Sequence, residues 1–187
     1  SSKEILKEID ERVEELKRRN EKVDREIKEK VKRLEEENEK VDREIKEILK
    51  ELEKEAEKRP RTEDLERKIR EVRDTLRRLH EENKEVNDRM RETVRRLHEK
   101  NKRMDERAKE EIEKIKEDIK RLEDKGTTEE VLERLRREVR KRIEDYKRKL
   151  DKIARDVDET IERYKRKLEE IKRRVEDEAR KIKEEIR

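Results

Sequence analysis

Cysteine, phenylalanine and tryptophan are absent from this sequence, and glycine and proline occur once each. The lack of cysteine excludes disulfides and thiolate metal sites. Tyr146 and Tyr164 are the only aromatic residues, so the chain has few rings on which nucleic-acid bases could stack. No apolar run reaches the length of a signal-peptide core or of a membrane-spanning helix, so we expect neither.

Charged residues dominate what is present. They make up 65% of the chain and hydrophobic residues 26%, against roughly 25% and 45–50% in a typical domain. A thick core is excluded, which leaves either a disordered polyampholyte or long helices that each bury a narrow stripe. The 63 basic and 59 acidic residues nearly cancel, to a net charge of +4, and alternate along the chain. No basic face is gathered, so we expect no nucleic-acid partner.

Two short breaks divide the chain. Pro60 precedes Thr62, a residue type that caps helices, and Gly126 suits the left-handed position after a helix end. Thr127 and Glu130 have the spacing of a capping box for the next helix. The predicted helices are about 2–57, 63–124 and 128–187, roughly 57–60 residues each. Links this short predict antiparallel neighbours, and thus a single up-down-up three-helix bundle over 1–187.

The apolar positions repeat every 18 residues in all three predicted helices. In the first, Val13, Leu16, Asn20, Val23 and Ile27 recur as Val31, Leu34, Asn38, Val41 and Ile45. In the second, Leu76, Leu79, Asn83, Val86 and Met90 recur as Val94, Leu97, Asn101, Met104 and Ala108. In the third, Ile143, Tyr146, Leu150, Ile153 and Val157 recur as Ile161, Tyr164, Leu168, Ile171 and Val175.

Such a repeat equals five turns of a helix with about 3.6 residues per turn, so it imposes almost no supercoil. We therefore expect straight, untwisted helices. The repeated positions span an arc of about 80°, which suits a helix that faces only two neighbours. This narrow stripe favours a monomer that needs no partner over a homo-oligomer.

Asparagine and tyrosine occupy core positions of the repeat. In an antiparallel pair, facing residues share a constant sum of residue numbers. Asn20 with Asn101 and Asn38 with Asn83 both give 121, and Asn101 with Tyr146 and Asn83 with Tyr164 both give 247. Two polar layers are therefore predicted: Asn20, Asn101 and Tyr146 beside His98, and Asn38, Asn83 and Tyr164 beside His80. Buried amides are stabilised only where they meet partners, so these layers should select one register.

The two histidines are interpreted as neighbours of these layers. His80 and His98 lie 18 residues apart and lack the closely spaced partners of a metal site, so neither a metal nor a cofactor is expected. A pH-responsive switch is an alternative interpretation, since histidine titrates near neutrality. The many carboxylates are interpreted as solvated helix faces with ion pairs four residues apart, and no catalytic group is predicted.

With these features the chain resembles computationally designed (de novo) parametric helical bundles that contain buried hydrogen-bond networks. The resemblance spans the whole sequence and rests on the 18-residue repeat, the duplicated Asn, His and Tyr positions, the two short breaks, and a surface of Glu, Lys, Arg and Asp. It implies a scaffold or building block with no native activity or cellular location, soluble and cytoplasmic if expressed in a cell. The alternatives are a subunit of a designed homo-oligomer and a natural spectrin-like spacer, although spectrin-like repeats typically carry core aromatics.

Overall fold

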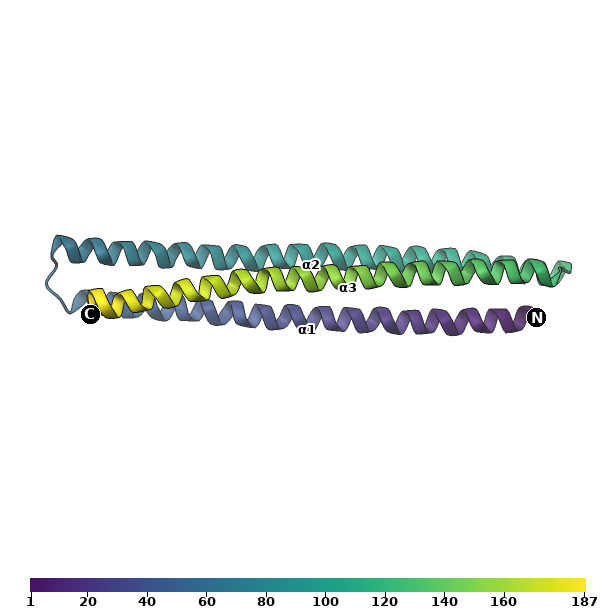
Figure 1. The fold of residues 1–187 in the computed structure, drawn as a ribbon, viewed down its shortest axis with the longest axis horizontal. Helices are drawn as coiled ribbons and strands as arrows, with labels where there is room; N and C mark the ends of the chain where they lie inside the picture. The colour runs from purple at the N-terminus through teal and green to yellow at the C-terminus, as the bar shows by residue number, and fades with distance from the viewer. The chain divides into compact units, whose positions relative to one another are not determined.

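The computed structural model describes all of residues 1–187. It contains three long α-helices, a terminal π-helical turn and no strand, which confirms the all-α prediction (Figure 1). The elements are α1 (Ser2–Glu57), α2 (Glu63–Lys125), α3 (Glu129–Lys181) and η1 (Ile182–Ile186). Their bounds lie within one residue of those predicted, except that α3 passes into the π turn where helix to residue 187 was expected.

The link between α1 and α2 ends in the predicted cap. The hydroxyl oxygen of Thr62 accepts a hydrogen bond from the backbone N–H of Leu65 at 3.2 Å. Its carbonyl accepts from the N–H of Glu66 at 3.0 Å. Three acidic residues in the first turn favour the positive end of the helix dipole. Thr62 therefore fixes where α2 begins.

The link between α2 and α3 differs from the prediction by one residue. Gly126 has a φ of +75°, the left-handed conformation that glycine adopts without strain. The cap is Thr128, whose hydroxyl oxygen accepts the N–H of Val131 at 3.4 Å. The prediction that Thr127 caps this helix was wrong. Either threonine could serve as a cap, but α3 starts at Glu129, so Thr128 occupies the cap position directly before it. Glu130 is then one position too early for the capping box.

The C-terminal turn is wider than an α-helical one. The N–H of Arg187 donates to the carbonyl oxygen of Ile182 at 2.8 Å, five residues back. Ile182 and Ile186 are both buried. The Arg187 guanidinium pairs with Glu51 at 2.7 Å and approaches Glu55 at 3.5 Å. The end of the chain is thereby attached to α1.

The chain consists of two compact units, each of which contains a segment of every long helix. Unit 1 is formed by Ser1–Lys28 and Val94–Asp158, and unit 2 by Glu29–Thr93 and Glu159–Arg187. The sequence-based prediction of a single bundle over 1–187 stays a prediction.

Each unit has its own core of aliphatic side chains. Unit 1 contains a cluster of eight buried residues: Ile5, Ile9, Ile112, Ile115, Ile119, Leu132, Val139 and Ile143. Unit 2 buries residues of all three helices and of the π turn, among them Ile45, Leu52, Leu76, Leu79, Val175 and Ile182. No large hydrophobic side chain of the molecule is exposed, so the apolar stripes are used within the units.

None of the helices combines the length and apolar character that crossing a lipid bilayer requires.

Candidate functional site

Three buried polar residues of unit 1, one on each long helix, contact one another. Asn20 of α1, Asn101 of α2 and Tyr146 of α3 are each at most 9% exposed. The side-chain amide of Asn101 donates to Asn20 Oδ1 at 2.6 Å. The amide of Asn20 donates in turn to the Tyr146 hydroxyl oxygen at 3.0 Å. The structure therefore brings together three residues that the sequence pairs through constant number sums.

The Tyr146 hydroxyl extends these contacts to a carboxylate. It donates to Asp105 Oδ1 at 3.2 Å, and the other Asp105 oxygen lies 3.0 Å from Lys109 Nζ. Burial raises the pKa of Tyr146, and the charges of Asp105 and Asp24 raise it further. Because the hydroxyl stays protonated at neutral pH, the hydrogen bonds form one directed chain. Asn101 donates to Asn20, Asn20 donates to Tyr146, and Tyr146 donates to Asp105.

Unit 1 also leaves two buried oxygen atoms without hydrogen bonds. They are Oδ1 of Asn101 and Oδ1 of Asp24. A buried acceptor without a partner costs roughly 1–3 kcal/mol. The polar contacts of unit 1 are therefore incomplete.

In unit 2 the equivalent asparagines bond to each other. The amide of Asn38 donates to Oδ1 and to the backbone carbonyl of Asn83, at 2.9 Å in both cases. The amide of Asn83 donates back to the backbone carbonyl of Asn38 at 3.1 Å. Tyr164, the third predicted member, is buried, but none of these bonds reaches it. Its ring instead contacts the ammonium of Lys167, 5.3 Å from the ring centroid.

Both histidines contact an aspartate of α1. His80 Nδ1 lies 2.6 Å from Asp42 Oδ1 in unit 2, and His98 Nδ1 lies 3.4 Å from Asp24 Oδ1 in unit 1. Sequence reasoning placed the histidines beside the layers and missed the two aspartates. A signal was present, because both pairs share a residue-number sum of 122.

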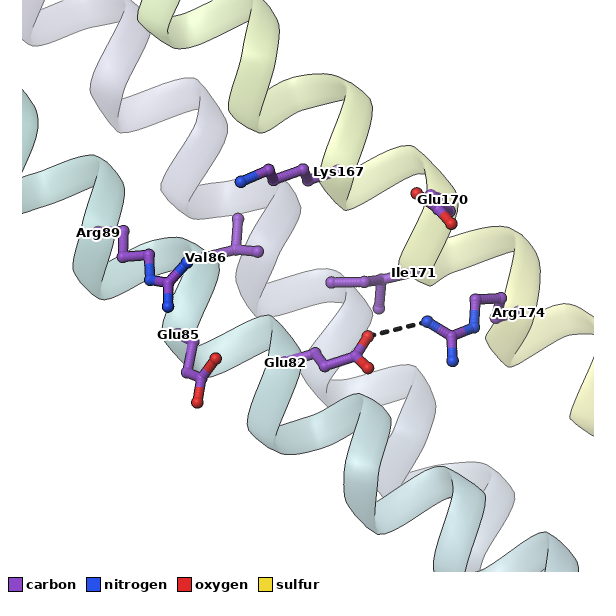
Figure 2. Close-up of a pocket in the computed structure, with 8 residues that line it drawn as sticks. All are labelled: Glu82, Glu85, Val86, Arg89, Lys167, Glu170, Ile171 and Arg174. Atoms are coloured by element: carbon purple, nitrogen blue, oxygen red, sulfur yellow. Dashed lines mark hydrogen bonds and ion pairs between the residues drawn. The ribbon is translucent and has the colours of Figure 1, made fainter.

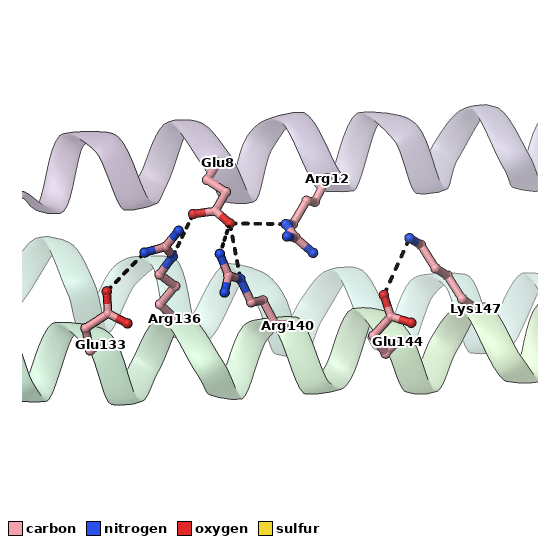
Figure 3. Close-up of polar contacts among 7 residues, drawn as sticks. All are labelled: Glu8, Arg12, Glu133, Arg136, Arg140, Glu144 and Lys147. Carbon is pink, nitrogen blue, oxygen red and sulfur yellow. Dashed lines mark hydrogen bonds and ion pairs between the residues drawn. The ribbon is translucent and has the colours of Figure 1, made fainter.

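A second cluster, which the sequence did not indicate, surrounds Glu8 in unit 1 (Figure 3). Glu8 Oε1 accepts from the Arg140 guanidinium at 2.6 Å and lies 3.3 Å from Arg12 Nε. Glu8 Oε2 lies 2.7 Å from Arg136 Nε. The hydrogen bond from Arg140 lowers the pKa of Glu8 to about 2, assisted by Arg136 and opposed by burial. This carboxylate ties α1 to α3 within unit 1.

Replacing this carboxylate should produce a pH-dependent loss of stability. Because the pKa of Glu8 falls from 4.5 to about 2 on folding, its contribution is complete above pH 4.5 and disappears as the pH falls through 2. We expect Glu8→Gln to lower the free energy of unfolding by about 1 kcal/mol at neutral pH, the upper range for partly exposed ion pairs. Urea titrations of both proteins from pH 7 to pH 2 measure the difference.

The control for this titration is Glu4→Gln, since Glu4 is 86% exposed and pairs with the terminal amine. It should leave stability nearly unchanged at neutral pH. A Glu8→Gln difference that persists undiminished at pH 2 would contradict the role of the Glu8 charge.

The surface of unit 2 has a shallow pocket of about 150 Å³ between α2 and α3 (Figure 2). Its lining residues are Glu82, Glu85, Val86, Arg89, Lys167, Glu170, Ile171 and Arg174. The three acidic and three basic side chains balance in charge, and Arg174 donates to Glu82 at 2.9 Å. The lining contains no serine, cysteine or histidine.

No group of three or more His, Asp or Glu side chains is arranged to hold a metal ion. No protein family, curated protein or solved structure matches the chain. The geometry of the buried polar residues is therefore the basis for a functional interpretation. What these residues do chemically is join helices through oriented hydrogen bonds.

Proposed function

We propose that this protein is a de novo designed structural scaffold without native biochemical activity, and that its buried polar residues select the register of the helices. One observation carries the proposal. The Asn20–Asn101 and Asn38–Asn83 hydrogen bonds both join α1 to α2, one in each unit, with the same residue-number sum of 121.

An antiparallel, up-down-up order of straight helices is part of the proposal. Within the units, three ion pairs between α1 and α2 support it because they share a residue-number sum of 126: Asp10–Lys116, Glu35–Arg91 and Glu53–Arg73. Contacts between α1 and α3 keep a nearly constant difference instead, as parallel helices do; Glu8–Arg140 and Glu51–Arg187 are examples. The 18-residue repeat supports straightness.

Register needs a selecting device because the repeat itself permits slippage. Moving α1 by one repeat along α2 would restore most apolar contacts. It would also place Asn20 opposite Ile119, a fully buried position, while Asn38 took Asn101 as its partner. The amide of Asn20 would then lose its hydrogen bonds, which costs roughly 1–3 kcal/mol. The asparagines therefore act against the alternative that the repeat makes most accessible.

The register can be tested by cross-linking engineered cysteines, since the chain has no cysteine of its own. The charged ends of Glu53 and Arg73 lie 2.5 Å apart on the surface of unit 2, so a short bismaleimide should link the double variant Glu53→Cys, Arg73→Cys within one chain. The matched control is Glu53→Cys, Arg91→Cys, whose cysteines come within reach only if α1 slips by the repeat that places Asn20 opposite Ile119. It should stay unlinked.

The same control is then placed in a background where Asn20, Asn101, Asn38 and Asn83 are leucine. We expect the slipped cross-link to appear there, measured by mass spectrometry and denaturing electrophoresis. If the slipped pair stays unlinked without the asparagines, they do not select the register. A cross-linked product of two chains, in place of one of 23.5 kDa, would favour a subunit of an assembly over a monomeric scaffold.

A further inference from the structure

The repeat places the same positions in both units, so each unit serves as a reference for the other. In α1, Val23 of unit 1 is half-buried, while its counterpart Val41 of unit 2 is 2% exposed. In α2, Leu97 is half-buried and Leu79 is fully buried. In α1 and α2, unit 1 thus buries less apolar surface at these positions, whereas the α3 positions are buried in both units.

The largest difference lies at the position of Met90. This side chain of unit 2 is 1% exposed, and its counterpart in unit 1 is Ala108, which is smaller and only partly buried. Between Val94 and Ile112 of α2, Asn101 is the only buried residue. The surrounding core is a small cluster, in which Leu16, Tyr146 and Leu150 are buried and Val23, Met104 and Ala108 partly so.

The direct contacts between the asparagines also differ. Three hydrogen bonds join Asn38 and Asn83 in unit 2, whereas in unit 1 one joins Asn101 to Asn20 and two more lead through Tyr146 to Asp105. Two buried oxygens, those of Asp24 and Asn101, lack hydrogen bonds in the repeat of unit 1, and one, Asn87 Oδ1, does so in the repeat of unit 2. Fewer buried apolar groups and more unmet acceptors both lower local stability.

We propose that unit 1 contains a site of local opening, formed by residues 10–28 of α1 and 95–111 of α2, which opens more often than the equivalent repeat of unit 2. Opening exposes the apolar cluster around Leu16 and Leu150 while the eight-residue cluster of unit 1 and the core of unit 2 stay closed. The sequence of these two segments thereby gives one repeat of α1 and α2 a lower local stability than the other.

The sequence contains an internal reference for testing this. Residues 20–29 and 38–47 are the same ten amino acids, Asn-Glu-Lys-Val-Asp-Arg-Glu-Ile-Lys-Glu. Their intrinsic amide exchange rates are therefore equal, and any difference in measured hydrogen exchange reports opening. We expect the amides of 21–28 to exchange at least about tenfold faster than those of 39–46. Fraying from Glu57 would give the opposite order, because 39–46 lies nearer that end. Fraying from Ser2 would also release the amides of 5–9, which the proposal keeps protected within the eight-residue cluster.

Two reciprocal variants connect the difference to its cause. Ala108→Met gives unit 1 the side chain of unit 2 and should slow exchange of 21–28 toward the rate of 39–46. Met90→Ala removes that side chain from unit 2 and should accelerate exchange of 39–46 by about tenfold or more. Equal protection of the two segments in the unmodified protein, or faster exchange of 39–46, would overturn the proposal. So would a Met90→Ala variant whose 39–46 amides exchange unchanged.

Discussion

Replacing Asn20 alone with leucine is expected to lower the free energy of unfolding by about 1–3 kcal/mol. The substitution removes the acceptor of the Asn101 amide and the donor to the Tyr146 hydroxyl in one step. Both remaining groups are buried, at 2% and 4% exposure, so water cannot replace the lost partner without opening the unit. Chemical denaturation followed by circular dichroism measures the change.

Replacing Asn20, Asn101 and Tyr146 together with leucine should have the opposite effect on stability. Of the hydrogen-bonded set only Asp105 then remains, and it keeps its ion pair with Lys109. Three apolar side chains fill the core positions, so the melting temperature should be kept or raised. The two experiments distinguish a contribution to the free energy of unfolding from a role in selecting the register. Only the single variant leaves the buried Asn101 and Tyr146 side chains without their Asn20 partner. A triple variant that unfolds near room temperature would show that these residues stabilise the fold directly.

The second large effect is expected in the aliphatic core of unit 1. Ile143 is fully buried and belongs to the eight-residue cluster. Ile143→Ala should lower the free energy of unfolding by about 2–5 kcal/mol, since it removes three carbon atoms and the neighbours fill the resulting space only in part. Urea titration with two probes measures this loss, and Ile143→Val should cost about 0.5–1.5 kcal/mol.

The matched control is Leu135→Ala, which shortens a partly buried side chain packed against the same cluster. Its effect should be clearly smaller, because part of the removed surface is already in water. Equal losses for the two alanine variants would mean that burial within this cluster does not determine its energetics.

The sequence predicts the elements of this fold well because its boundaries rest on local chemistry. Pro60, Thr62 and Gly126 act within a few residues of their own positions, and α1 and α2 begin and end within one residue of the prediction. The choice between Thr127 and Thr128 was missed because adjacent threonines offer the same chemistry. The difference between them lies in a single hydroxyl contact.

Pairing between helices is only partly readable from the sequence. Constant residue-number sums predicted the pairs Asn20–Asn101 and Asn38–Asn83, and both are hydrogen-bonded. The prediction succeeds because a short polar side chain reaches only the residue directly opposite. Tyr164 was placed with the asparagines, yet their bonds go to each other and to backbone carbonyls, which carry no sequence signature.

Long side chains are the least predictable part of the candidate site. Glu8 meets three arginines on two helices, and similar residues occur throughout a chain that is 65% charged. Flexible stems let each arginine reach several acidic partners, so spacing does not identify the one it selects. The aspartates beside the histidines were missed because the number sums were taken over asparagine and tyrosine alone, although both His–Asp pairs share a sum of 122.

The distribution of the two tyrosines has a practical consequence for spectroscopy. Tyr146 lies in unit 1 and Tyr164 in unit 2, and the chain has no tryptophan to mask their emission. A Tyr164→Phe variant would therefore carry one intrinsic fluorophore that senses unit 1 alone, and Tyr146→Phe one that senses unit 2. Each half of the protein can be followed optically without any attached dye.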